Sequence, residues 1–305
     1  MGLLYKNHLI NNRKADETAT IALDKLSLEY EYQYSQVQFK NRELVSKSYI
    51  NKTPPNILIP FNHKGVRFNM ISCPAGDYVR FKKQPRVNYK IEDPFMLGET
   101  EVTQELFEAV MGFNYSNCKD SNQNPVEMVT WFDCLEFCNR LSDCFELDHY
   151  YELYDKRYET DDKYHLSIVD AKPHFVRIAN GFRLPKEWEW QFAYRAGTNN
   201  KYAGANDDES LKRVAWFDAS SDKKTYPVAQ KLPNEWGFYD MTGNVSEWCE
   251  TPKSLSNNHN HSENRVINGD NSYQDEFLGD ELQRLDIASP NYRTESIGFR
   301  IAKSI

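Results

Sequence analysis

Several features are scarce or missing in this 305-residue chain, and each absence excludes a class of function. No apolar run approaches the roughly 20 residues that a bilayer-spanning helix requires, so we expect no contact with a membrane. The net charge of −8 disfavours nucleic acid as a partner, since phosphate binding requires clustered lysine and arginine. The stretch Met1–His8 lacks the apolar core and cleavage site of a signal peptide, which predicts a cytoplasmic protein of open oligomeric state.

Cysteine is also scarce, because the chain has only six cysteines and no CxxC pair. This pattern predicts reduced, mostly buried thiols rather than a disulfide framework. Cys134 and Cys138, four residues apart on a predicted helix, are expected to face the core rather than to hold a metal. No cysteine follows Cys249.

The most informative segment present is Gly237–Cys249, which reads GFYDMTGNVSEWC. Two glycines, an Asp and an Asn bracket aromatic and aliphatic residues, a composition typical of a folded turn between strands. The carboxylate of Glu247 follows a run of backbone carbonyls that such a turn can point inward. Carbonyl and carboxylate oxygens are the ligands that calcium prefers.

Five further motifs occur in a fixed order: GETEVTQ at 98–104, NPVEMVTW at 124–131, FCNRLS at 137–142, GFRLPKEWEW at 181–190 and GFRIA at 298–302. In order and spacing, the six segments resemble the formylglycine-generating enzyme family, also called sulfatase-modifying-factor proteins. The resemblance covers roughly Val66 to Ala302. It implies a C-type-lectin-like fold with little regular structure.

The chain divides into a predicted helical arm, residues 1–55, and a formylglycine-generating-enzyme-like domain, residues 56–305. Apolar residues near heptad spacing predict the helix of the arm, over 16–49, and the prolines after Thr53 end it. The arm either packs on its own domain or docks on a partner, and the sequence leaves both open.

The domain itself is predicted to be a loop-dominated α+β fold. We expect a strand at 66–70, helices at 104–111 and 131–141, a further helix beginning near Glu187, and a short hairpin within 148–179.

The resemblance implies that this member lacks the family's catalytic cysteine pair. Active members use two thiolates to hold Cu(I). When Ser272-Tyr273 and Gly298-Phe-Arg300 are aligned with the family motifs, the two thiol positions fall on Asp275 and Asp280. Carboxylates are hard ligands that do not replace thiolates for Cu(I), so we expect no copper and no formylglycine formation.

The resemblance also implies a structural calcium ion. Carried over from the family, its ligands are the backbone carbonyls of Asp240, Gly243 and Val245 together with the side chain of Glu247. The alternative is a turn that is held by its own hydrogen bonds alone.

A binding groove remains as the candidate functional surface. In the family fold, the stretch from Asp270 to Asp286 lines the groove that holds substrate peptide, and here it combines acidic residues with aromatic ones. We expect a protein or peptide partner, basic in character, to contact Tyr273, Asp275, Phe277, Asp280 and Arg293. The alternative is an ordinary solvated face.

Three functions stay open. The favoured one is a non-catalytic binding or scaffold protein, bacterial in origin, that uses this groove, the N-terminal helix or both. The second is a metal-dependent oxidoreductase with an unorthodox site, for example one in which Asp275, Asp280 and nearby histidines hold a metal. The third is a variable protein of a diversity-generating retroelement, a class that often uses this fold and binds ligands.

Overall fold

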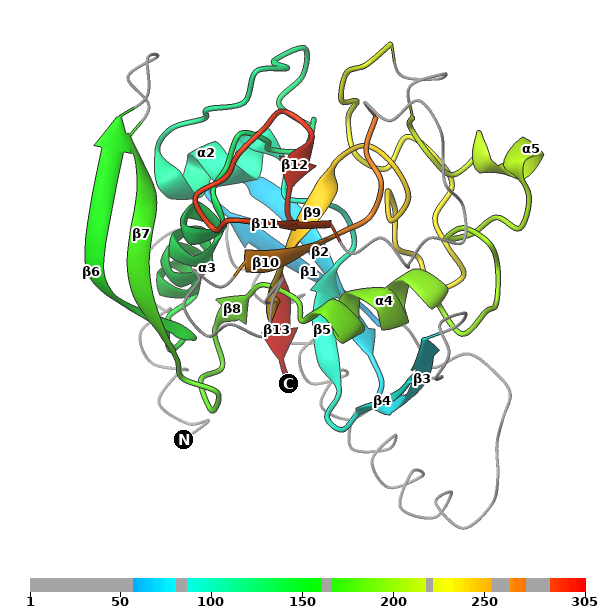
Figure 1. Ribbon diagram of the computed structural model, residues 1–305, viewed down its shortest axis with the longest axis horizontal. Helices are drawn as coiled ribbons and strands as arrows, with labels where there is room; N and C mark the ends of the chain where they lie inside the picture. The colour runs from blue at the N-terminus through cyan, green and yellow to red at the C-terminus, as the bar shows by residue number, and fades with distance from the viewer. Residues whose placement is uncertain (1–56, 81–86, 161–165, 218–221, 254–263, 273–285) are drawn as a thin grey trace, which may run out of the picture. The chain divides into compact units, whose positions relative to one another are not determined.

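The computed structural model describes residues 57–80, 87–160, 166–217, 222–253, 264–272 and 286–305. All of them belong to the unit Thr53–Ile305, and the predicted arm at 1–55 lies outside them. They form the loop-rich α+β fold that the sequence predicts (Figure 1). No helix in this part of the chain is both long enough and apolar enough to cross a bilayer.

The centre of the fold is a five-stranded sheet in the order β1-β2-β5-β13-β8. Every neighbouring pair in it is antiparallel. The strands are Leu58–His63 (β1), Val66–Cys73 (β2), Phe95–Gly98 (β5), Phe182–Arg183 (β8) and Ala302–Ser304 (β13). Because β13 lies between β5 and β8, the end of the chain joins segments that are far apart in the sequence.

A second sheet has four strands in the order β11-β10-β9-β12. The strands are Ser246–Lys253 (β9), Asn264–Asn268 (β10), Asp286–Ala288 (β11) and Ile297–Gly298 (β12). β10 is antiparallel to β9 and β11, whereas β12 is parallel to β9. Strand β9 begins within the GFYDMTGNVSEWC segment and continues beyond it, so this motif leads directly into the centre of the second sheet.

Two separate hairpins complete the strands. One pairs β3, Gly76–Arg80, with β4, Val87–Ile91. The other pairs β6, Tyr151–Thr160, with β7, Leu166–Phe175, so the hairpin expected within 148–179 exists. The expectation that it is short is wrong, because each strand has 10 residues. Its many exposed charged residues leave no regular alternation of apolar and polar residues from which the full strand length could be predicted.

The helices begin where capping residues occur in the sequence. α2 spans Gln104–Met111, and the Leu106 N–H donates to Thr103 Oγ1 at its start. α3 spans Trp131–Cys144, and Thr130 and Asp133 form a reciprocal capping box at its first turn. These elements confirm the predicted helix at 104–111 and extend the one predicted at 131–141 by one turn.

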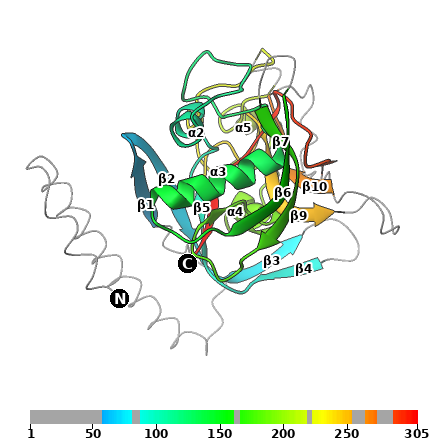
Figure 2. The same ribbon diagram turned by 90° about the vertical axis from the view of Figure 1, so that its left-hand side faces the viewer.

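Two more helices lie later in the chain. α4 spans Glu187–Arg195, beginning at the predicted residue, and α5 is the single turn Asp208–Leu211. In Figure 2, α3 lies beside the β6–β7 hairpin, and it also packs against β8.

The core consists mainly of aromatic side chains around α2 and α3. The rings of Phe107 and Phe137 stack at 5.5 Å, and both contact Phe299 edge to face. Cys134 and Cys138 are fully buried in the same cluster, which confirms that they face the core. A second buried cluster surrounds Trp190 on α4.

The turn before β9 gives a first prediction. Gly243 has φ +92°, and a Cβ atom there would lie 2.2 Å from the Trp216 carbonyl oxygen. Gly65 has nearly the same φ, +90°, but no atom lies within 4 Å of its Cβ position. Gly65→Ala should therefore cost only the left-handed strain of about 1–2 kcal/mol, whereas Gly243→Ala should cost clearly more in the free energy of unfolding.

Urea denaturation of the two variants measures this difference. Equal losses of stability would show that the close approach of Gly243 to Trp216 contributes nothing to the fold.

Candidate functional site

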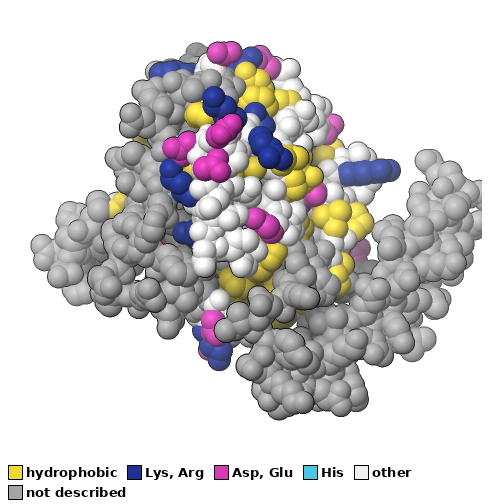
Figure 3. All heavy atoms as spheres, turned by 90° about the vertical axis from the view of Figure 1, so that its right-hand side faces the viewer, with side chains coloured by type: hydrophobic (Ala, Val, Ile, Leu, Met, Phe, Trp, Pro, Cys, Tyr) yellow, Lys and Arg dark blue, Asp and Glu magenta, His cyan; other side chains and the backbone are white. Residues whose placement is uncertain are grey.

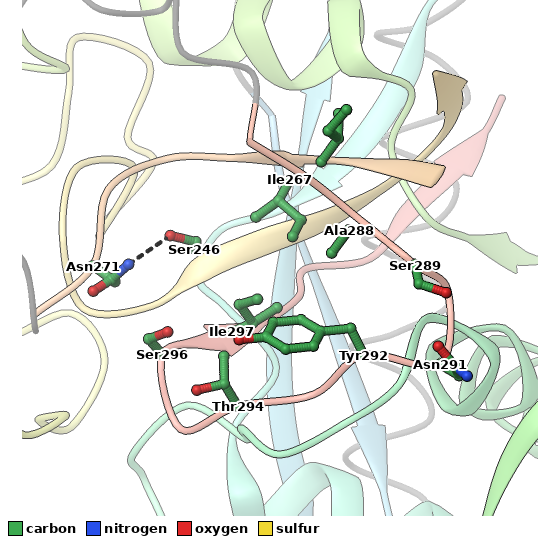
Figure 4. Close-up of a pocket in the computed structure, with 11 residues that line it drawn as sticks. Ser246, Ile267, Asn271, Ala288, Ser289, Asn291, Tyr292, Thr294, Ser296 and Ile297 are labelled. Carbon is green, nitrogen blue, oxygen red and sulfur yellow. Dashed lines mark hydrogen bonds between the residues drawn. The ribbon is translucent and has the colours of Figure 1, made fainter. Parts of the chain in front are cut away.

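A cavity of about 530 Å³ opens over the four-stranded sheet, between β10–β11 and the segment 289–297 (Figure 4). Its apolar lining residues are Ile267, Ile287, Ala288 and Ile297. Its polar lining residues carry only hydroxyl and amide groups: Ser246, Asn271, Ser289, Asn291, Tyr292, Thr294 and Ser296. Among the described residues, therefore, no Asp, Glu, Lys, Arg, His or Cys side chain lines this cavity.

The lining determines which chemistry the cavity supports. Hydroxyl and amide groups both donate and accept hydrogen bonds, so they recognise neutral polar groups. General acid–base or nucleophilic catalysis requires a titratable side chain next to the reacting group. Tyr292, whose side chain is half exposed, is the one titratable group that the described lining offers. Among the described lining residues, therefore, no two titratable side chains lie together as a catalytic pair.

The residues predicted for the groove from the sequence fall in two places. Tyr273, Asp275, Phe277 and Asp280 lie outside the described residues. Arg293 does not line the cavity, because its Nη1 donates to Ser167 Oγ on β7 at 2.6 Å.

The sequence prediction missed the lining residues of 289–296. A usable signal existed in the segment directly before GFRIA, where neutral Tyr292, Thr294 and Ser296 alternate with charged Arg293 and Glu295. Such alternation places the two sets of side chains on different sides of a chain segment.

Behind the cavity, β9 carries a buried ion pair. The Arg300 Nε and Nη2 atoms donate to the two carboxylate oxygens of Glu247, each at 2.7 Å. The Trp190 Nε1–H also donates to Glu247 Oε2, at 2.6 Å. Both charged side chains are almost completely buried, so the bidentate geometry compensates for their lost hydration.

Two more buried carboxyl groups lie near this pair. Glu101 accepts hydrogen bonds from the Val245 N–H and from Asn244 Nδ2. Burial raises its pKa, and the nearby Asp240 and Glu247 raise it further. Burial likewise raises the pKa of Asp240 to about 6. Asp240 Oδ2 accepts from the Ala229 N–H, whereas Asp240 Oδ1 is buried without a donor among the described residues.

The donor chemistry of this cluster fits a hard cation in part. A buried carboxylate oxygen without a donor, Asp240 Oδ1, is the type of ligand that calcium prefers. Glu247, the side-chain ligand expected from the family motif, already contacts Arg300 and Trp190. No group of three or more His, Cys, Asp or Glu side chains is arranged for a metal in the described ranges. A calcium shell here would therefore need backbone carbonyls, including those of Gly243 and Val245.

The cysteines are separate from the cavity. All six are free, and none lines the cavity. Burial raises the pKa of the Cys73, Cys134 and Cys249 thiols well above the ordinary value, which keeps them protonated. These three are unreactive core residues in the described structure.

Glu127 lies next to the residues that support the cavity rim. Its Oε1 accepts from the Cys118 N–H at 2.8 Å, and its Oε2 is buried without a donor among the described residues. The following residue, Met128, donates its N–H to the Thr294 carbonyl on the rim. Burial raises the pKa of Glu127 to about 7, and the nearby Glu295 adds to this increase.

Residues 61–305 match the sulfatase-modifying factor enzyme 1-like domain. The chain belongs to this family.

Two curated relatives and one solved structure illustrate its range. The chain is 34% identical over 187 residues to the chaperone protein LppX of Paenibacillus barcinonensis, covering 52% of this chain and 65% of LppX. It is 27% identical over 157 residues to the inactive C-alpha-formylglycine-generating enzyme 2 of Bos taurus, covering 45% and 48%. Both matches span less than two thirds of the relative's length. The structure of Treponema denticola variable protein 1 superposes with a TM-score of 0.69 at 28% identity, covering 83% of this chain and 100% of that one.

Glu127 gives a prediction about pH. Its pKa is about 7 in the folded protein against an ordinary value of 4.5, so the native state binds more protons than the unfolded state between these values. The contribution of Glu127 to stability is therefore fully present below pH 4.5 and is lost as the pH rises through 7. The loss is at most about 3 kcal/mol.

The variant Glu127→Gln keeps the acceptor for Cys118 and removes the titration. Thermal unfolding at pH 5 and pH 8 should show a smaller pH-dependent loss of stability for this variant than for the wild type. Other buried carboxyl groups also titrate in this range. The contribution of Glu127 is therefore the difference between the stability that the wild type loses from pH 5 to pH 8 and the stability that the variant loses. An identical loss in both would refute the assignment.

Proposed function

We propose that this protein is a non-catalytic binding protein that holds a peptide segment of a protein partner in the cavity over the four-stranded sheet. The observation that carries the proposal is the described lining, which consists of hydroxyl, amide and aliphatic side chains. Such a surface recognises a ligand without providing a nucleophile paired with a base. The alignment that puts Asp275 and Asp280 at the copper-ligand positions supports the same conclusion.

The relatives support binding over catalysis. LppX is named a chaperone protein, and the relative from Bos taurus is named inactive. The likeness to Treponema denticola variable protein 1 favours a second candidate, a variable protein of a diversity-generating retroelement. Both candidates use the cavity for binding, and they differ in whether its ligand is one defined partner or a changing set.

The charge distribution supports a basic protein partner. The chain has a net charge of −8, and the sequence from Asp270 to Asp286 contains six acidic residues. On the face shown in Figure 3, cationic and anionic side chains of the described residues are interspersed. The described residues on that face therefore form no continuous basic surface of the kind that nucleic acid requires.

A cavity-filling variant tests the proposal. Peptides selected from a random 12-residue phage library on the immobilised full chain serve as probes. Ala288→Trp places a large ring in the cavity and should weaken binding of the selected peptides at least tenfold, measured by fluorescence polarisation. Thr160→Trp, on the exposed β6 strand, is the matched control and should bind normally.

If Ala288→Trp binds the peptides as the wild type does, the binding site lies on another surface, such as the predicted helical arm at 1–55. Oxidation of a cysteine peptide of the sulfatase type, supplied with copper and oxygen and followed by mass spectrometry, would replace the binding function by the enzymatic one.

We further propose that the turn before β9 binds calcium as a structural ion beside Glu247, through Asp240 Oδ1 and the backbone carbonyls of Asp240, Gly243 and Val245. The calcium ion would compensate the negative charge of the buried carboxylates and would take no part in a reaction. A saturating concentration of about 100 times Kd should stabilise the fold by about 2.7 kcal/mol.

The melting temperature should therefore rise when CaCl2 is added to EGTA-treated protein. Asp240→Asn should abolish the rise, whereas Asp93→Asn, at an exposed position, should keep it. A melting temperature that does not respond to calcium would show that Arg300 is the only cation of the cluster.

A further inference from the structure

The segment 289–296 forms one rim of the cavity, and its backbone is fixed by the rest of the domain. The Trp131 N–H donates to the Pro290 carbonyl at 3.0 Å, and the Met128 N–H donates to the Thr294 carbonyl at 3.1 Å. The Ser246 N–H donates to the carbonyl of Ser296 at 2.9 Å. Although the segment lacks regular structure, residues 128–131 at the start of α3 and Ser246 on β9 hold it, so its side chains are presented in a preorganised arrangement.

Side chains along this rim alternate between two roles. Arg293 donates to Ser167 at 2.6 Å, and Glu295 accepts from Asn117 at 3.5 Å, so the charged residues attach the rim to its neighbours. The intervening residues Tyr292, Thr294 and Ser296 line the cavity (Figure 4). We call these three residues the ligand face.

The ligand face carries three hydroxyl groups that are available to a ligand. Within the described ranges, none of the three side chains forms a hydrogen bond or an ion pair. The polar residues on the opposite wall differ, because Asn271 Nδ2 donates to Ser246 Oγ, and Ser246 Oγ donates to the Gly269 carbonyl. The free hydrogen-bonding capacity of the cavity is therefore concentrated on the rim.

We infer that the ligand face determines specificity and selects an uncharged stretch of peptide, whose main-chain amides pair with the Tyr292, Thr294 and Ser296 hydroxyls. This inference rests on the proposed peptide-binding function. Main-chain N–H and C=O groups suit hydroxyls, which donate and accept equally well. The aliphatic floor of Ile267, Ile287 and Ile297 suits a small apolar side chain beside those amides.

We expect a charged side chain of the ligand to be disfavoured in the cavity, because the described lining offers it no ionic partner. A buried charge without a partner is strongly unfavourable, and the described lining contains no ionic partner. The basic residues expected in the partner therefore flank the bound stretch, outside the cavity. Selectivity then arises from the lack of an ionic partner among the described lining residues as much as from their hydroxyl groups.

The test uses the peptides selected on the full chain. Their shared central positions should hold Gly, Ala, Val, Ser, Thr or Asn. Replacing the central residue of the best peptide by Lys or by Glu should weaken binding at least tenfold. Thr294→Val removes one hydroxyl at nearly constant volume and should weaken binding about fivefold, the effect of one hydrogen bond of about 1 kcal/mol.

Matched controls separate recognition from folding. Tyr292→Ala should weaken binding, whereas Tyr158→Ala, at a similarly exposed tyrosine on β6, should not. Thr160→Val on the same strand is the control for Thr294→Val. Because the ligand-face hydroxyls have no described partner, Thr294→Val should leave the melting temperature unchanged.

The outcomes distinguish this inference from the proposed function. If Ala288→Trp abolishes binding while Thr294→Val does not, or while central Lys or Glu is accepted, the cavity binds peptides but the inference is overturned. If Ala288→Trp leaves binding intact, the proposed function fails first. Binding of neutral glycans on an array, with no peptide bound, would overturn both in favour of a carbohydrate site.

Discussion

The fold depends on the buried ion pair between Glu247 and Arg300. Arg300 donates to the Glu247 carboxylate and also to the carbonyls of Gly98 and Tyr239, so one guanidinium joins the end of β5, the turn before β9 and β9 itself. Removing one partner of such a buried pair leaves an uncompensated charge and typically costs about 3–5 kcal/mol. The pair explains why two motifs that are far apart in the sequence, GNVSEW and GFR, occur together: each supplies one half of a single interaction.

Local signals in the sequence were sufficient to predict the elements that have their own capping chemistry. Thr103 and the residues around Glu187 marked helix starts correctly, because a cap is a contact within a few residues. The length of the β6–β7 hairpin was not predictable in this way. Its strands are stabilised by pairing with each other rather than by an alternating buried face, since most of β6 is exposed.

The predicted groove along 270–286 stays a prediction, because most of that stretch lies outside the described residues. The described cavity lies beside it and is lined by Asn271 and by residues within 287–297. The lining residues of 289–296 were missed because a single sequence does not show that the Thr294 and Ser296 carbonyls accept from Met128 and Ser246. Without those contacts, the segment reads as an ordinary loop. Arg293 was predicted to contact the partner, and yet its guanidinium donates to Ser167 and attaches the rim to β7.

Charged and neutral side chains have different tasks in the scaffold and in the cavity. Buried charges hold the scaffold together, because a bidentate ion pair fixes the direction of both partners. The cavity on the other side of β9 and β10 contains neutral side chains, whose hydrogen bonds are weak individually and depend on position. A scaffold that is already held rigidly can present such groups without a further cost of ordering when a ligand binds. The proposed binding function therefore uses a scaffold that is already ordered, and the alternation along the rim puts the hydroxyls of Tyr292, Thr294 and Ser296 on the cavity side.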